Sequence, residues 1–338
     1  MAVEMVQVPR SDATSAFMIF KIMNNSRIPE VTKLELEKGA DKHIEYYFNA
    51  IKFGLPDTLS YSLIWKPMNI SNDIKKVFLS SSGILHLMNF NLLRTSQGSY
   101  LADNQSIVNI TNTGNIVNAL KQKSAFQSAV LVGVSDFEAW RNDNSNFNSV
   151  QNLPGVAKEV YQLDSLLKNE GVATTSILNE QVTEEFFYGL ESSSILHLAS
   201  HGFYDVNNIN AMLGSGLLLN KSDSLNDGFL TAYEASLLDL NKTELVVLSA
   251  CNSGLGEVLE GEGVYGLQRA FEAAGADHII MSLWKIDDVF TQYFMNSFYH
   301  NLMRSKDVSA AFNQTLIQAK NQNEDPRFWG AFKLVKCY

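Results

Sequence analysis

The chain has 338 residues, 46% of them apolar and 18% charged, with a formal net charge of −10 and a pI of about 5.1. This composition can form a sizeable core and argues against a disordered chain, and the acidic balance argues against direct nucleic-acid or membrane partners. No apolar run reaches the roughly 18 residues of a transmembrane helix, and the N-terminus lacks the apolar stretch of a signal peptide. The two cysteines, Cys251 and Cys337, argue against a disulfide framework, so we expect a cytoplasmic protein with a free thiol at Cys251.

Residues 1–70 are predicted to form a mainly helical, regulatory segment. Between 35 and 54, for example, charged residues are mixed with aromatic ones. Two short runs rich in β-branched residues follow at 75–79 and 106–110, and their Ser, Asn and Gly neighbours indicate that both are strands. No internal repeat of about 34 residues is visible, so the chain has no helical repeat array of its own.

From residue 126 onward, apolar runs alternate with amphipathic segments. The predicted strands, most of them short apolar runs, cover 129–134, 173–178, 195–200, 245–249, 279–284 and 331–335. The predicted helices cover 156–170, 184–190, 261–274, 287–303 and 308–320. This alternation predicts an α/β domain with a largely parallel central sheet, in which ligands bind outside the carboxyl ends of the strands.

Two of these predicted strands lead directly into residues that can carry out chemistry. His201 follows the run ILHLAS, and Cys251 follows LVVLSA. If the two parallel strands are neighbours, both residues meet at one sheet edge, where a histidine can act as the base for a cysteine nucleophile. Gly202 lacks a side chain, so its N–H can approach a substrate carbonyl and, with the N–H of Cys251, stabilise an oxyanion. The candidate catalytic residues are therefore His201, Cys251 and Gly202.

Each of these residues also has a plainer interpretation. Taken alone, a cysteine after a buried strand is more often a small core residue, and a histidine beside small residues is more often only hydrogen-bonded. His197 and His201 are four residues apart, a spacing that suits a metal ion on a helix but spans about 13 Å on a strand. We therefore expect no metal site and a structural role for His197. No strand is followed by a glycine-rich phosphate-binding motif, and no cofactor is expected.

Four stretches resemble a known family: ILHLASHG, LTAYEASLLDLNKTELVVLSACNSGLG, GEGVYGLQRAFEAAGADHIIMSLWKIDD and FWGAFKLV. Together they are similar to the bacterial CHAT domains, caspase-like cysteine peptidases that are related to caspases and separase and are often joined to tetratricopeptide repeats. The resemblance implies a caspase-like three-layer sandwich over 126–338, with a largely parallel central sheet flanked by helices. Over 71–125 the resemblance is weaker and implies a degenerate caspase-like half without catalytic residues. Residues 1–70 precede this half and form the separate N-terminal segment.

The resemblance also assigns roles to individual residues. It implies that Cys251 is the nucleophile, that His201 is the general base, and that the backbone N–H groups of Gly202 and Cys251 bind the oxyanion, without a third catalytic residue. It further implies that the strand near Met281 pairs with the substrate backbone, as in β-strand addition. The expected substrate-binding residues are Ser282, Leu283, Trp284, Lys285 and Asp205.

Specificity is predicted from the stretch after Trp284. Separase, which cuts after arginine, has W-D-V-T-D here, whereas this chain has W-K-I-D-D, with Lys285 in place of the first Asp. Asp287 and Asp288 are interpreted as helix-capping residues, because acidic side chains favour a helix N-terminus. These two observations predict a substrate with an uncharged or hydrophobic residue at the cleavage site (P1).

The expected function is that of a regulated cysteine endopeptidase that cleaves a specific protein partner. Analogy with relatives places it in bacterial antiviral defence, with a gasdermin-like or other effector as substrate. A sensor protein with tetratricopeptide repeats is the expected regulator. One alternative is a catalytically silent CHAT scaffold. The presence of both His201 and Cys251 argues against this alternative. Another is a thiol amidase that acts on small molecules.

Overall fold

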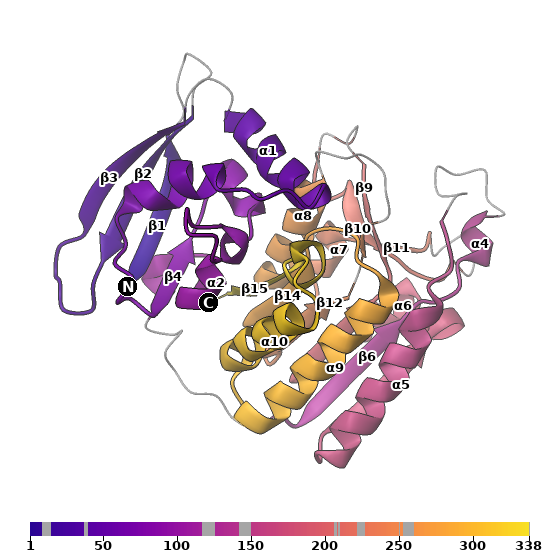
Figure 1. Cartoon of the computed structure of the whole chain (residues 1–338). Helices are drawn as coiled ribbons and strands as arrows, with labels where there is room; N and C mark the ends of the chain where they lie inside the picture. Colours follow the sequence, from indigo (N-terminus) through magenta and orange to yellow (C-terminus); the bar gives the residue numbers. More distant parts are fainter. Residues whose placement is uncertain are drawn as a thin grey trace. The chain divides into compact units, whose positions relative to one another are not determined.

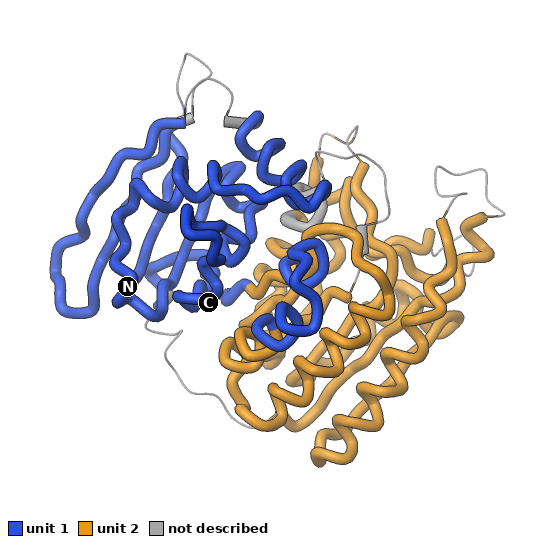
Figure 2. Tube along the Cα trace, in the orientation of Figure 1, with its two compact units in different colours: residues 1–121, 316–330, 335–338 blue, residues 122–315, 331–334 orange. Residues whose placement is uncertain are grey.

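The computed structural model describes residues 1–8, 15–36, 40–116, 126–141, 150–205, 208, 210–221, 227–249, 251–252 and 260–337. The chain divides into two compact units, shown in two colours in Figure 2. Unit 1 comprises 1–121, 316–330 and 335–338, and unit 2 comprises 122–315 and 331–334. Within the described ranges, no helix has the length and apolar character required to cross a membrane.

Unit 1 is built on a mixed sheet in the order β3-β2-β1-β4-β5. Its strands are β1 (Ala2–Val8), β2 (Ser15–Ile22), β3 (Glu30–Leu36), β4 (Lys76–Ser80) and β5 (Ser106–Ile110). The first three pair antiparallel, whereas β1, β4 and β5 run parallel to one another. The end of β15 (Phe332–Lys336) continues the parallel pairing, because Val335 lies opposite Asn109.

The prediction of a mainly helical N-terminal segment is wrong, because three strands occupy much of the first 36 residues. The physical reason is a period-two pattern: Val3 and Met5 in β1, and Phe17 and Ile19 in β2, are completely buried. Alternate residues of a strand face the same side of a sheet, so these side chains cover one face. A longer helix appears only afterwards, as α1 (Ala40–Lys52).

The remaining helical segments that the structure describes in unit 1 are short. They are a π-helical turn at Tyr61–Trp65, 3₁₀ turns at Lys66–Met68, Gly83–Leu87, Phe90–Leu92 and Thr113–Asn115, and the helices α2 (Leu101–Asn104) and α11 (Pro326–Trp329). The buried side chain of Asn89 connects two of these regions, because its Nδ2 donates to the carbonyl oxygen of Gly330 at 2.7 Å. The longer helix α10 (Val308–Gln322) contributes its last residues to unit 1.

Unit 2 contains the parallel sheet that the sequence predicts, with neighbouring strands in the order β14-β12-β8-β6-β7. The strands are β6 (Ser128–Gly133), β7 (Ala173–Leu178), β8 (Ile195–Ala199), β12 (Leu245–Leu248) and β14 (His278–Ser282). All four neighbouring pairs are parallel. The central strands β8 and β12 are buried along their whole length, which explains why their sequences are continuous apolar runs.

Helices cover both faces of this sheet (Figure 1). The crossovers β6–α5–β7 and β12–α8–β14 run in opposite directions across the sheet, so right-handed connections place α5 (Pro154–Asn169) and α8 (Glu260–Ala273) on opposite faces. Helix α9 (Asp288–Ser305) packs beside α5. The predicted α/β class, with a largely parallel sheet flanked by helices, is therefore confirmed. The shorter helices α4 (Glu138–Arg141), α6 (Glu184–Tyr188) and α7 (Ala232–Ala235) lie in the connections.

A second, smaller sheet follows the carboxyl ends of β8 and β12. Its order is β11-β10-β9-β13, and it consists of β9 (His201–Tyr204), β10 (Ser215–Leu218), β11 (Phe229–Thr231) and β13 (Cys251–Asn252). This sheet was not predicted, because strands of two to four residues are too short to show a period. It carries the candidate catalytic residues.

Candidate active site

The backbone brings His201 and Cys251 opposite each other. Strands β8 and β12 are parallel neighbours, with Leu198 opposite Leu248, which meets the condition for His201 and Cys251 to share one sheet edge. Their continuations β9 and β13 are also parallel neighbours, and Cys251 is the register partner of His201. Opposed positions on adjacent strands are about 5 Å apart. The side chain of Cys251 lies outside the described part of the structure.

Gly202 occupies the next position in the same small sheet. It lies opposite Asn252 of β13 on one side and opposite Leu217 of β10 on the other. Gly202 is therefore adjacent to the register pair of His201 and Cys251, as expected for a residue at the same edge. Its assignment as an oxyanion donor stays a prediction.

The imidazole of His201 is buried and held in a defined orientation. The residue is 2% exposed, its Nε2 lies 2.7 Å from the carbonyl oxygen of Gln151, and its ring centroid lies 4.7 Å from that of Phe137. A carbonyl oxygen can only accept a hydrogen bond, so Nε2 must carry a proton and donate it. In the neutral imidazole, Nδ1 is then the basic nitrogen.

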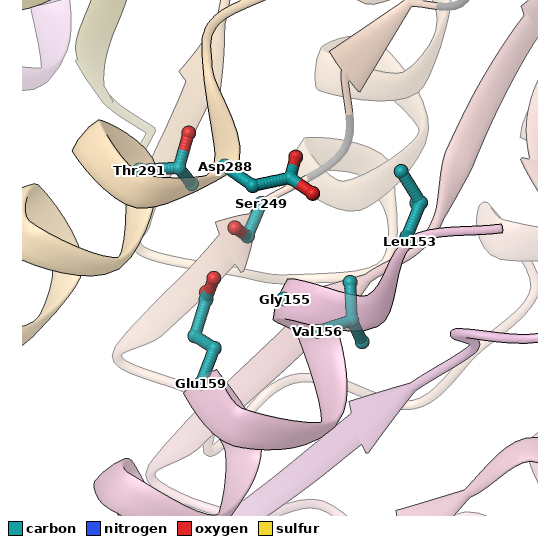
Figure 3. A pocket seen from close by; sticks show the side chains of 7 residues that line it. All are labelled: Leu153, Gly155, Val156, Glu159, Ser249, Asp288 and Thr291. Atoms are coloured by element: carbon teal, nitrogen blue, oxygen red, sulfur yellow. The ribbon is translucent and has the colours of Figure 1, made fainter. Parts of the chain in front are cut away.

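A small pocket, with a cavity volume of about 20 Å³, lies in the same region of unit 2 (Figure 3). Its lining residues come from the start of α5, the end of β12 and the first turn of α9, and they are Leu153, Gly155, Val156, Glu159, Ser249, Asp288 and Thr291. Ser249 precedes Cys251 by two residues, and Leu153 follows Gln151, the partner of His201, by two residues. The pocket thus adjoins both segments that carry the candidate site.

Asp287 and Asp288 have different roles, although the sequence analysis treated them alike. Oδ1 of Asp287 accepts hydrogen bonds from the backbone N–H groups of Val289 and Phe290 at 3.0 and 3.2 Å, so the capping prediction is confirmed for Asp287. The side chain of Asp288 instead lines the pocket. Burial raises the pKa of Asp288, and the nearby charges of Asp287 and Glu159 raise it further, while Lys285 and His201 act in the opposite direction.

His197 is completely buried and belongs to a polar chain beneath the pocket, which confirms that it is a buried residue of the scaffold. Its Nε2 lies 2.9 Å from Oε1 of Glu159, and its Nδ1 lies 3.1 Å from the hydroxyl of Tyr299. A neutral imidazole satisfies both contacts by donating to the carboxylate and accepting from the hydroxyl. Among the described residues, no group of three or more His, Cys, Asp or Glu side chains is arranged to hold a metal ion.

Part of the expected substrate-binding segment already belongs to the sheet. Met281 pairs with Leu248, and the N–H of Leu283 donates to the carbonyl oxygen of Ala331 at 2.8 Å. Ser282 and Leu283 are buried, at 4% and 7% exposure. A substrate strand added at Met281–Leu283 would therefore have to replace existing hydrogen bonds.

The other expected substrate contacts lie closer to solvent. Trp284 and Lys285 follow the end of β14, where Trp284 is half-buried and Lys285 is exposed. Asp205 lies just after β9 and is exposed, and its backbone N–H donates to the carbonyl oxygen of Gly214 at 2.6 Å. Their contact with a substrate stays a prediction.

Sequence analysis did not identify several polar residues near the site, namely Gln151, Glu159, Ser249 and Thr291. Gln151 acts through its backbone carbonyl, which carries no sequence signal. Glu159 could have been identified from its position, because it lies on the buried face of α5 between Val156 and Val160. A carboxylate at a core position is rare unless it is paired.

The described structure is an α/β protein with a histidine and a cysteine in register beyond the carboxyl edge of a parallel sheet. Its sequence matches the model of the CHAT domain over residues 58–336, and the chain belongs to this family. The expected CHAT family is thus confirmed, while its bacterial origin stays a prediction.

Among curated proteins, the chain is similar to Tetratricopeptide repeat protein 28 of Mus musculus and of Homo sapiens. Each match is 33% identical over 114 residues and covers 33% of this chain and 4% of the relative. The chain therefore spans only a small part of the length of these relatives.

Two solved structures are similar in fold, at 12% sequence identity each. The Drosophila initiator caspase Dronc matches with a TM-score of 0.36, over 60% of this chain and 76% of that chain. The Saccharomyces cerevisiae separase–securin complex matches with a TM-score of 0.46, over 94% of this chain and 21% of that chain.

Proposed function

We propose that this protein is a caspase-like cysteine endopeptidase in which Cys251 is the nucleophile and His201 is the general base. The observation that carries the proposal is the register of β9 and β13, which sets the backbones of these two residues opposite each other. The hydrogen bond from Nε2 of His201 to Gln151 adds to it, because it leaves Nδ1 as the basic nitrogen. Membership of the CHAT domain family agrees with this chemistry.

The proposed reaction proceeds in two steps. First, Nδ1 of His201 takes the proton of the Cys251 thiol, and the sulfur attacks the peptide carbonyl carbon, so that a C–S bond forms and negative charge develops on the oxygen. The N–H groups of Gly202 and Cys251 stabilise that oxyanion. The imidazolium then gives its proton to the leaving amine as the C–N bond breaks. In the second step, Nδ1 removes a proton from water, the resulting hydroxide attacks the thioester, and the acid product leaves as the proton returns to the sulfur.

The carbonyl of Gln151 orients the base in this scheme. Its hydrogen bond fixes the tautomer of His201 and offsets part of the charge of the imidazolium as it forms. A backbone carbonyl thereby supplies the orienting role that a carboxylate has in other hydrolases. This is consistent with a site that needs no third catalytic side chain.

The substrate is proposed to be a specific protein in the cytoplasm, and cleavage is proposed to be regulated by a sensor partner. Both curated relatives are named as tetratricopeptide repeat proteins. Because such repeats form extended binding surfaces, their occurrence in relatives favours a sensor that contains these repeats. A role in defence, with a gasdermin-like or other effector as the substrate, belongs to the same proposal.

The test compares new protein N-termini in cells that express the wild type, Cys251→Ala or His201→Ala. We expect a small set of cleavage products with the wild type and none with either variant, while both variants keep the melting temperature of the wild type. Identical products from wild type and Cys251→Ala would overturn the proposed function.

A further inference from the structure

The two groups that hold the imidazole of His201 come from different segments of unit 2. The carbonyl oxygen of Gln151, just before α5, accepts a hydrogen bond from Nε2 at 2.7 Å. The ring of Phe137, in the connection after β6, packs against the imidazole with the two centroids 4.7 Å apart and the planes inclined at 57°. Phe137 is completely buried, so its ring belongs to the core. The orientation of the imidazole therefore depends on how these two segments are held together.

The side chain of Asn152 joins the two segments. Asn152 directly follows Gln151, and its Oδ1 accepts a hydrogen bond from the backbone N–H of Phe137 at 3.0 Å. The same oxygen accepts from Nη1 of Arg141, at the end of α4, at 2.9 Å. Because both partners can only donate, the atom between them must be the amide oxygen, and the orientation of the amide is determined. One side-chain oxygen thus connects the residue after Gln151 to the backbone of Phe137.

The segment that presents Phe137 is itself anchored to the end of β7. Oδ1 of Asn179 accepts from the N–H and the hydroxyl of Ser135 at 2.8 and 2.9 Å, and from the N–H of Asp136 at 3.3 Å. The carbonyl oxygen of Ser135 in turn accepts from the N–H of Leu153 at 2.9 Å. This segment is therefore a fixed support, against which the amide oxygen described above can hold the residues before α5.

The exposure of Asn152 distinguishes a positioning role from a folding role. Asn152 and Arg141 are both exposed, and an exposed hydrogen bond adds little net stability because water can replace it. The group that is positioned is buried, since His201 is only 2% exposed. Displacement of the Gln151 carbonyl would weaken its hydrogen bond with Nε2, which becomes stronger when the imidazole gains a charge. Loss of the Asn152 oxygen should therefore affect the base much more than it affects the fold.

We propose that Asn152 is a positioning residue for the candidate base His201. Its amide oxygen holds the Gln151 carbonyl and the Phe137 ring where they fix the imidazole and stabilise the imidazolium, the first as a hydrogen-bond acceptor and the second through its aromatic face. A stabilised imidazolium favours the thiolate of Cys251, because the two charges attract each other. This inference rests on the proposed function, since it requires that His201 takes the proton of the Cys251 thiol.

The test measures the rate at which iodoacetamide alkylates Cys251 of the full chain between pH 5 and pH 9, by peptide mass mapping. Iodoacetamide reacts with the thiolate, so the rate reports the pH at which the thiol loses its proton, and no substrate has to be known. Asn152→Leu keeps the volume but removes the acceptor, Asn152→Ala removes the side chain beyond Cβ, and Asn152→Asp keeps an acceptor oxygen.

Asn112→Leu is the matched control. Asn112 is also exposed, and its Oδ1 also accepts from a backbone N–H, that of Gly114 at 2.6 Å, but it belongs to unit 1. The two substitutions therefore remove the same kind of hydrogen bond, only one of which adjoins the residue that holds His201. Melting temperatures establish that each variant is folded.

In the wild type we expect alkylation to begin well below the pH of about 8.5 at which a free thiol titrates, and His201→Ala should lose this reactivity at low pH. Asn152→Leu and Asn152→Ala should each move the midpoint of the profile up by about one pH unit, which lowers the thiolate fraction below the midpoint about tenfold. Their melting temperatures should stay within a few degrees of the wild type. Asn152→Asp should restore the wild-type profile, and Asn112→Leu should leave it unchanged.

The outcomes separate the positioning role from the proposed function. An unchanged profile in Asn152→Leu and Asn152→Ala, or an equal shift in Asn152→Asp, would overturn the positioning role and leave the pair of His201 and Cys251 intact. An equal shift in Asn112→Leu would overturn it as well, because the profile would then follow the loss of any such hydrogen bond. A wild-type profile like that of a free thiol, which His201→Ala does not alter, would overturn the proposed function together with this inference.

Discussion

The carboxylate of Glu159 accepts a hydrogen bond from His197 at 2.9 Å, although the two side chains are only 5% and 0% exposed. The hydroxyl of Tyr299 completes this chain on the far side of the imidazole at 3.1 Å. Helix α5, strand β8 and helix α9 are thus connected by one buried polar network. Because a satisfied buried network specifies a single arrangement, it fixes the floor of the pocket as well as the packing of both helices.

Glu159→Gln should destabilise unit 2, because the amide removes the negative charge that the imidazole contacts. We expect the free energy of unfolding to fall by about 1–3 kcal/mol, measured by urea denaturation. Glu170→Gln is the matched control, since Glu170 is exposed at the other end of α5 and its loss should change stability by less than about 0.5 kcal/mol. Equal effects of the two substitutions would contradict the importance of the network.

Lys333 gives the protein a stability that increases with pH. It lies in β15 at 2% exposure, and burial lowers its pKa from 10.5 to about 7. Between these two values the unfolded chain binds a proton that the folded chain does not, so the free energy of unfolding rises with pH and the destabilisation is fully present below about pH 7. The slope attributable to Lys333 is at most about 1.4 kcal/mol per pH unit.

Lys333→Met tests this assignment by removing the titrating group while keeping an apolar stem of similar length. Urea denaturation at pH 7, 8 and 9 should show that the variant is more stable than the wild type at pH 7 and that the difference shrinks towards pH 9. Lys242→Met, at an exposed position, serves as the control and should leave the pH dependence unchanged. A difference that is constant from pH 7 to pH 9 would rule out the assignment.

Gly133→Ala should separate α5 from the sheet. A Cβ atom at Gly133 would lie 2.7 Å from Cγ1 of Val156 and 2.9 Å from Cδ2 of Leu178, which is closer than packed atoms approach. We expect a loss of about 1–3 kcal/mol in the free energy of unfolding. Gly189→Ala is the control, because its nearest atom lies at 3.7 Å, and it should have little effect. A melting temperature for Gly133→Ala equal to that of the control would contradict the close contact.

Gly155→Ala should narrow the pocket without unfolding the protein. The added Cβ would lie 2.6 Å from Nε2 of Gln292 and 3.1 Å from Cβ of Asp288, so Asp288 has to move. Alanine favours the helix that contains this position, and the melting temperature should therefore stay within a few degrees of the wild type. A fall of more than about 10 °C in the melting temperature would contradict the expectation that the structure tolerates this Cβ atom.

The central strands of unit 2 were predictable because they are buried on both faces. The sequence predicts strands over 195–200 and 245–249, and the structure contains β8 and β12 at nearly the same limits, each buried along its whole length. A strand inside a parallel sheet must be apolar on both sides, so its sequence is a continuous apolar run that is easily identified. Strands β1 and β2 lack this feature, because exposed or partly exposed residues interrupt the buried ones along both strands.

The small sheet and the pocket could not be predicted in the same way. Strands β9 and β13 contain four and two residues, too few for any periodicity to appear. The pocket combines Glu159, Ser249 and Asp288, which are separated by 90 and 39 residues along the chain and have no local motif in common. Asp288 shows why such a site is hard to predict. Its position beside Asp287 indicates a helix cap, but its side chain lines the pocket.

The sequence by itself determined the alternation of strands and helices in unit 2, the family, and the two strand ends at which His201 and Cys251 lie. These features follow from local patterns of apolar and polar residues, which can be identified directly in the sequence. The tertiary structure alone decided which strands are neighbours, that Nε2 of His201 donates to Gln151, and that Ser249 shares a pocket with two carboxylates. Such relationships depend on how distant segments pack, and packing brings together residues that no local pattern connects.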